Sequence, residues 1–150
     1  MTGKFDKFRA LSGPEQRALI AAALLLPSFW LGLRVLGLRR FQSLLRRPAQ
    51  IGAQRRTGID PARLGYLVNA AANHTLLPAT CLTRSLLLDW WLRRRGIDSS
   101  LRIGVRVVDR ALEAHAWVEC GGRPVNDALD VGIRFTAFEG QLHPQSFSAP

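Results

Sequence analysis

The chain has 150 residues, of which 47% are hydrophobic and 21% charged, a balance that is typical of a folded domain and excludes a disordered segment. This length accommodates about one domain, so we look for a single site. The net charge of +10 favours an anionic partner. Nearly all the cations, however, are arginines scattered along the chain, and they do not alternate with aromatic residues as in proteins that bind single-stranded nucleic acid. We therefore expect no nucleic-acid partner.

The first predicted helix follows Ser12, which has Glu15 three residues later in the pattern of a capping box. Residues 18–33 then carry no charge and are interrupted only by Pro27. At 1.5 Å per residue this stretch extends about 24 Å, less than the ~30 Å hydrocarbon core of a bilayer, so we expect a helix packed in the core. Because five arginines follow between residues 34 and 47, a helix lying on an anionic membrane surface is a second interpretation and a membrane span a third.

The segment 48–61 is rich in Gly, Gln, Arg and Thr, has no apolar periodicity and is predicted to be a linker. We therefore expect an N-terminal apolar helical region, residues 1–50, followed by a catalytic core, residues 51–150. Both belong to one compact domain.

A second helix is predicted to begin after Asp60, an N-cap residue followed by Pro61 at the first helical position. It should end near Asn73, because apolar residues recur at helical spacing up to that point. A third helix is predicted to begin with Cys81, after Thr80 as N-cap. Its end is marked by three consecutive arginines, residues 93–95, and Gly96.

The apolar period then changes from helical to alternating. Residues 101–108 and 113–120 alternate in the manner of strands, and Asp109 with Arg110 supplies the turn between them. Gly121 and Gly122 predict a second tight turn into a third strand over residues 123–127. The segment 135–150 shows no period and is expected to be irregular. The predicted fold class is therefore α+β, with the cysteine-bearing helix packed on a small antiparallel meander.

Three residues of this arrangement form a candidate catalytic triad: Cys81, His115 and Asp127. A catalytic cysteine reacts as the thiolate, which the positive end of a helix and a nearby imidazolium stabilise. It also needs a general base and a group that orients the base. A hairpin centred near Gly121 would place positions 115 and 127 opposite one another on the same face.

Each of these residues, taken alone, is more often structural. A cysteine at a helix start is commonly a small buried residue, a strand histidine that shares a face with Trp117 is commonly a core residue, and an aspartate after Asn126 commonly belongs to a turn. The ordered set is what indicates a cysteine nucleophile with its base and orienting acid.

The other candidates have weaker patterns. Cys120 ends a strand without a helix field or a base and is predicted to be structural, while His74 and His143 lie near predicted helix and tail ends. No spacing typical of metal ligands is present, so neither a metal nor another cofactor is expected. The N-terminus carries no recognisable secretory signal, so we expect reduced thiols in the cytoplasm, with membrane association as the alternative noted above.

Several short motifs occur together in the second half of the chain. They are Cys81-Leu82-Thr83-Arg84-Ser85-Leu86, the arginine-rich helix end with Gly96-Ile97, the strand Leu101-Arg102-Ile103-Gly104-Val105, His115-Ala116-Trp117-Val118-Glu119, and Asn126-Asp127. With these motifs, the segment from His74 to Asp127 resembles the C-terminal protease region of lasso-peptide biosynthesis proteins, the microcin-processing type of the transglutaminase-like superfamily. The front part resembles the leading region of the standalone version of this protease.

The resemblance implies a papain-like helix and antiparallel sheet, with Cys81 as nucleophile, His115 as base and acid, and Asp127 as the orienting acid. It implies removal of the leader from a ribosomally made precursor peptide, which frees the core for a separate ATP-dependent macrolactam synthetase. Some members carry a fused winged-helix domain that binds the leader; the length of this chain leaves no room for one, so a separate leader-recognition protein is the expected partner.

Two other functions are compatible with the same residues. The triad could transfer the acyl group to an amine, as transglutaminases do, or the chain could be a basic peptide- or membrane-binding module with an inactive site. Product masses distinguish the first from hydrolysis, and labelling with a thiol-directed probe distinguishes the second.

Overall fold

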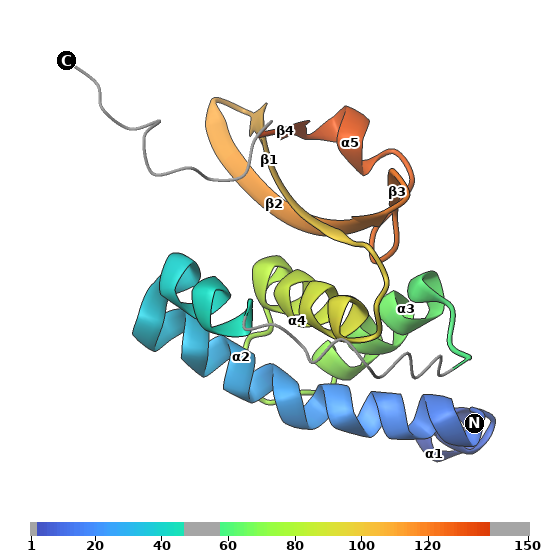
Figure 1. Ribbon diagram of the computed structural model, residues 1–150. Coiled ribbons are helices and arrows are strands. Elements are labelled where there is room, and N and C mark those ends of the chain that lie inside the picture. The colour runs from blue at the N-terminus through green and yellow to red at the C-terminus, as the bar shows by residue number, and fades with distance from the viewer. Residues whose placement is uncertain (1–2, 47–57, 139–150) are drawn as a thin grey trace.

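The computed structural model describes residues 3–46 and 58–138, which form three layers (Figure 1). A long helix lies beneath two shorter helices, and a curled sheet lies above them. The helices are α1 Lys4–Arg9, α2 Gly13–Leu45, α3 Pro61–Ala72, α4 Cys81–Arg94 and α5 Val131–Arg134. The strands are β1 Ser100–Val108, β2 Ala111–Cys120, β3 Arg123–Pro124 and β4 Thr136–Ala137. Most of the predicted linker, 48–61, lies outside the described residues, so the division of the chain near residue 50 stays a prediction.

The predicted start of α2 is confirmed, because the Glu15 carboxylate accepts hydrogen bonds from the backbone N–H and the hydroxyl of Ser12. The helix is interrupted at Gly37, whose φ of 72° is outside the helical range and is readily adopted by glycine. The part after Gly37 folds back, so that the ring of Phe41 packs over Gly32 and meets Phe29 edge-on at 5.3 Å.

The helix α2 is buried on one face only. That face contributes to the main core, and its buried residues are Ala18, Ala22, Leu26 and Phe29. The prediction of a core helix therefore holds for one side of the apolar stretch. By length and composition alone the 33-residue helix could cross a membrane, and 17% of its most apolar window is buried inside the protein.

An ion pair between Glu15 of α2 and Arg63 of α3, 2.5 Å between Oε1 and Nε, links the first two layers. The Arg63 guanidinium, together with the donors of Ser12, lowers the pKa of Glu15 to about 2. Folding lowers the pKa of this carboxylate, so its ionised form stabilises the folded state at any pH above the pKa of the unfolded chain. As the pH falls from that value towards the lower pKa of the folded protein, this stabilisation is lost.

We therefore expect wild-type stability to decline as the pH falls from about 4.5 to about 2, and Glu15→Gln to remove this part of the decline. Urea unfolding across that pH range measures it. The two proteins should differ in unfolding free energy at neutral pH and converge near pH 2. An equal difference at both ends of the range would contradict the proposed role of the ion pair.

The predicted boundaries of α3 and α4 are confirmed. The side chain of Asp60 accepts from the N–H groups of Ala62 and Arg63, and Thr80 accepts from the N–H of Thr83. The two helices pack between α2 and the sheet, where a leucine-rich cluster forms the core; its members on these helices are Leu64, Leu67, Val68, Ala71, Ala72, Leu86, Leu87, Leu88 and Leu92.

The sheet has the strand order β3-β2-β1-β4 in the part of the chain that the structure describes. Both predicted turns are confirmed, since Asp109, Arg110, Gly121 and Gly122 all have positive φ, as a two-residue hairpin turn requires. Two predictions are wrong. The third strand ends at Pro124 instead of residue 127, and residues 136–137, expected to be irregular, form β4 on the free edge of β1.

Candidate active site

Cys81 is the first residue of α4, as predicted. Its helix start is fixed by Thr80, whose hydroxyl accepts from the Thr83 N–H at 3.3 Å and lies 3.0 Å from the Thr83 hydroxyl. The Cys81 side chain is half-buried and unbridged. Cys81 therefore lies at the end of α4 where the first N–H groups have no helical acceptors.

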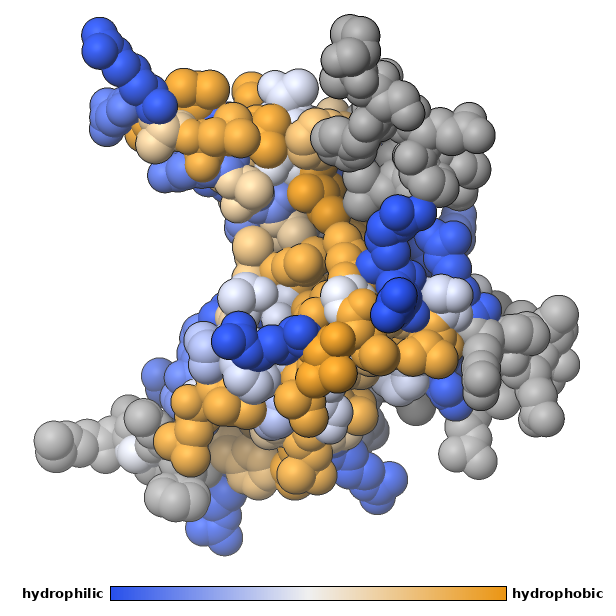
Figure 2. Space-filling view, turned by 90° about the vertical axis from the view of Figure 1, so that its left-hand side faces the viewer, coloured by the Kyte–Doolittle hydropathy of each residue, from blue (hydrophilic) through white to orange (hydrophobic). Residues whose placement is uncertain are grey.

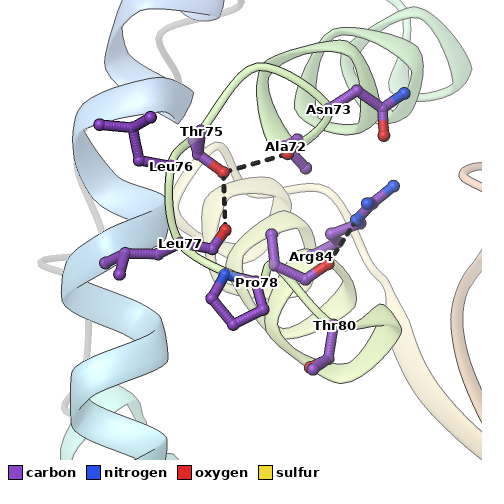
Figure 3. A pocket seen from close by; sticks show the side chains of 9 residues that line it. Ala72, Asn73, Thr75, Leu76, Leu77, Pro78, Thr80 and Arg84 are labelled. Atoms are coloured by element: carbon purple, nitrogen blue, oxygen red, sulfur yellow. Dashed lines mark hydrogen bonds between the residues drawn. The ribbon is translucent and has the colours of Figure 1, made fainter.

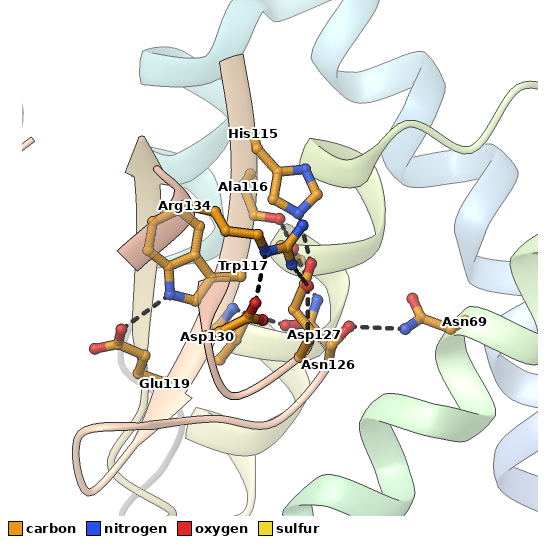
Figure 4. A network of polar contacts seen from close by, with 12 residues as sticks. Asn69, His115, Ala116, Trp117, Glu119, Asn126, Asp127, Asp130 and Arg134 are labelled. Atoms are coloured by element: carbon orange, nitrogen blue, oxygen red, sulfur yellow. Dashed lines mark hydrogen bonds and ion pairs between the residues drawn. The ribbon is translucent and has the colours of Figure 1, made fainter. Parts of the chain in front are cut away.

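His115 and Asp127 lie side by side, with His115 Nε2 and Asp127 Oδ2 2.5 Å apart (Figure 4). The imidazole is further held by stacking on Phe135, at 4.9 Å between ring centroids. The other carboxylate oxygen of Asp127 accepts from the Ala128 N–H at 2.7 Å and lies 3.4 Å from Arg134. These contacts fix the orientation of the imidazole ring. Nε2 faces the carboxylate, so Nδ1 is the nitrogen that remains for another partner.

The contact is made from a different backbone position than predicted. The two-residue turn is centred between Gly121 and Gly122, so β3 is offset by one position from the predicted register, with Cys120 opposite Arg123. Asp127 does not lie on a strand opposite His115; it lies in the loop that follows β3. The loop brings the carboxylate to the edge of β2 that β3 leaves uncovered.

Asn126 holds this loop in place. Its side-chain oxygen accepts from the Val118 N–H at 2.8 Å, and its side-chain nitrogen donates to the Ser85 hydroxyl at 2.9 Å. Its backbone carbonyl accepts from Asn69 of α3 at 2.9 Å (Figure 4). Gly65 permits this close approach, because a side chain there would collide with the backbone of Val125. The loop that carries Asp127 is thus tied to α3, α4 and β2 at once.

The helix α4 is held against β2 in a defined register. Ser85 donates to the backbone carbonyl of Ala116 at 3.0 Å, and Asp89 accepts from Ser99, just before the start of β1, at 2.7 Å. Cys81 lies one turn before Ser85 and on the same helix face. The contact of α4 with β2 at Ser85 is therefore one residue from His115, and Cys81 lies one turn earlier along the helix.

The structure joins His115 to Asp127 but does not join Cys81 to either by a hydrogen bond. Alternation along β2 directs Ala116 and Val118 towards the helices, while His115 shares its face with Trp117 and Phe135. Hydrogen bonds between nucleophile and base are often long before substrate binds. The complete triad stays a prediction.

Ser85 and Asn126 were not assigned roles from the sequence, although both lie in the motifs that carry the resemblance. We expect Asn126→Ala to lower the unfolding free energy by about 1–3 kcal/mol, because it leaves the Val118 N–H without its acceptor and the Ser85 hydroxyl without its donor. Urea unfolding of Asn126→Ala, Ser85→Ala and the double variant tests the link. Strictly additive effects would contradict a shared network.

The competing residues are separate from this arrangement. Burial raises the pKa of the Cys120 thiol, and the negative charges of Asp89, Asp98 and Asp60 raise it further, so this thiol is kept protonated and unreactive. His74 is exposed just after α3. His143 lies outside the described residues.

A cavity of about 440 Å³ opens beside the start of α4 (Figure 3). The loop before Cys81 forms its floor, and Thr75 stabilises that loop through hydrogen bonds to the carbonyls of Ala72 and Leu77. Arg84 donates through Nε to the Ala79 carbonyl. The lining mixes apolar and polar groups and consists of Ala72, Asn73, Thr75, Leu76, Leu77, Pro78, Ala79, Thr80 and Arg84.

Comparison with known proteins places this chain in a family. A family model described as the transglutaminase-like superfamily matches residues 23–139. The Microcin J25-processing protein McjB of Escherichia coli is 43% identical over 53 residues, which make up 35% of this chain and 24% of that protein, so the match spans about a quarter of the relative's length. No solved structure matches the chain. The predicted resemblance is thereby confirmed, and because the family match covers most of the sequence, including positions 81, 115 and 127, the chain belongs to the transglutaminase-like superfamily.

Proposed function

We propose that this protein is a cysteine peptidase that removes the leader from a ribosomally made lasso-peptide precursor, with Cys81 as nucleophile, His115 as base and acid, and Asp127 as the orienting acid. The observation that carries the proposal is the His115–Asp127 pair, 2.5 Å apart. His115 is next to Ala116 on β2, whose carbonyl accepts from Ser85, one turn after Cys81 on α4. This is the pairing of base and orienting group that a cysteine nucleophile requires.

In the proposed reaction the Cys81 thiolate attacks the scissile carbonyl and forms a tetrahedral oxyanion. The backbone N–H of Cys81, at the positive end of α4, is one donor for that oxyanion. Protonated His115 gives its proton to the leaving amine, which frees the core peptide and leaves the leader as a thioester on Cys81. Water, deprotonated by His115, then hydrolyses the thioester and releases the leader as a carboxylic acid.

The cavity beside Cys81 supports a peptide substrate. Its lining ends at Thr80 and resumes at Arg84, so it borders the first turn of α4 on one side of the nucleophile. The apolar loop residues suit an apolar peptide side chain, and Asn73 with Arg84 offers donors for peptide carbonyls. We propose that it receives residues adjacent to the scissile bond.

The substrate class rests on the similarity to a microcin-processing protein, which covers only part of that relative. We infer that the precursor is presented by a separate leader-recognition protein of the winged-helix type, and that the released core passes to an ATP-dependent macrolactam synthetase. We propose that the genes for the recognition protein and the synthetase lie near the gene for this protein.

Acyl transfer to an amine is the second candidate, favoured by the family description. Incubation of the protein with the precursor encoded nearby, with and without the recognition protein, followed by mass spectrometry, distinguishes the candidates. A leader that ends in a free carboxylate indicates hydrolysis, and a leader joined to an added amine indicates transfer. An intact precursor under all these conditions would contradict both and favour a non-catalytic binding module.

A further inference from the structure

The outer face of α2 is apolar and uncovered in the structure. Four large side chains on this face, spaced four, seven and four residues apart, are 51–72% exposed. This spacing places them along one side of the helix, opposite the face that packs on α3 and α4. We call these residues the α2 stripe: Ile20, Leu24, Leu31 and Val35.

Positive charge lies at both ends of the stripe. Arg17 precedes it and Arg34 accompanies its far end, while Arg39 and Arg40 lie beyond Gly37 on the part that folds back. Among the described residues none of these arginines forms an ion pair, whereas Glu15, the acidic residue of α2, is paired with Arg63. Figure 2 looks at the side of the molecule where α2 folds back, and hydrophobic residues gather there with hydrophilic ones around them.

We propose that α2 docks on the surface of an anionic lipid bilayer through the α2 stripe, with the flanking arginines on the lipid headgroups. An interfacial helix is defined by this combination of an apolar face and cationic residues at its border. Trp30, which lies beside the stripe with the Arg34 guanidinium 5.8 Å from its ring, is an aromatic residue typical of the headgroup region.

The helix lies on the surface and does not cross the membrane. Its inner face holds α3 and α4 through Ala22, Leu26 and Phe29, and these contacts would be lost if α2 left the domain to span a bilayer. The fold-back at Gly37 also ends the straight part of the helix. Since the sheet lies on the other side of α3 and α4 from α2, docking leaves the sheet away from the lipid (Figure 1).

Lipid is favoured over a protein partner by the charge pattern, because both ends of the stripe carry uncompensated cations that match a uniformly anionic surface. The test is cosedimentation of the full chain with phosphatidylcholine vesicles, with and without phosphatidylglycerol. We expect binding to the anionic vesicles only, with Leu24→Glu combined with Leu31→Glu lowering the partition coefficient about tenfold or more. Each of Arg17→Gln and Arg34→Gln should lower it roughly fivefold.

The matched control is Leu112→Glu, because Leu112 is 70% exposed, as Leu24 is 72% exposed, but lies on β2. It should bind as the wild type does. Absence of binding to anionic vesicles, or equal loss in the stripe and control variants, would overturn the proposal. Self-association that the stripe variant abolishes in the absence of lipid would also overturn it and assign the stripe to a second copy. The assay needs no precursor, so its result is independent of the proposed peptidase activity.

Discussion

Replacing Cys81 with alanine is expected to abolish cleavage of the precursor while leaving the fold intact. The thiolate is the nucleophile in the proposed reaction, and the other described cysteine, Cys120, has a thiol whose pKa is raised by burial and by nearby carboxylates. The substitution removes only a half-buried sulfur at the helix start, where Thr80 still provides the cap. Mass spectrometry of the precursor after incubation measures the loss, and circular dichroism reports on the fold.

The control variant is Cys120→Ser, which removes the thiol of the other cysteine. Because burial and nearby carboxylates keep the Cys120 thiol protonated, cleavage should continue in this variant. Retained cleavage by Cys81→Ala, or its loss in Cys120→Ser with the fold preserved, would contradict the assignment of the nucleophile.

Asp127→Asn is expected to lower the rate of cleavage by about 10²- to 10⁴-fold, as judged from the loss of the orienting acid in other triads. The amide keeps the size of the side chain but cannot stabilise the imidazolium, and its nitrogen favours the wrong tautomer of His115. Single-turnover kinetics with the precursor measures the effect on the chemical step. Substrate binding should change little, because Asp127 faces the histidine.

Two other aspartates serve as controls. Asp130 pairs with Arg134, 3.2 Å between Oδ2 and Nε, and Asp109 lies in the turn between β1 and β2. Their asparagine variants should retain most of the rate. A normal rate in Asp127→Asn, with a large loss in Asp130→Asn or Asp109→Asn, would transfer the orienting role to that residue.

The parts of the fold that local chemistry determines were predictable. Asp60 and Thr80 cap α3 and α4 as expected, and Gly121 with Gly122 forms the expected turn, because these features depend on residues close in sequence. The end of β3 was not predictable, because Asn126 takes the Val118 N–H with its side chain and thereby ends the strand pairing. The strand β4 depends on a distant partner, β1, and leaves no local pattern in two residues.

The candidate site shows the same division. The contact of His115 with Asp127 was predicted, although from a register that is one residue wrong, because a loop reaches the position assigned to a strand. The role of Ser85 was not predicted, since its two hydrogen bonds join it to residues 31 and 41 positions away. Similarly, residues 18–33 carry no charge on any side of the helix, so the sequence does not indicate which face of α2 packs against α3 and α4.

The central claim is that Cys81 and His115 act as one unit, and the most direct test is the rate at which iodoacetamide labels Cys81 in a Cys120→Ser background. If the imidazole activates the thiol, His115→Ala should slow this labelling by about tenfold or more at neutral pH. Identical labelling rates with and without the imidazole would contradict the account.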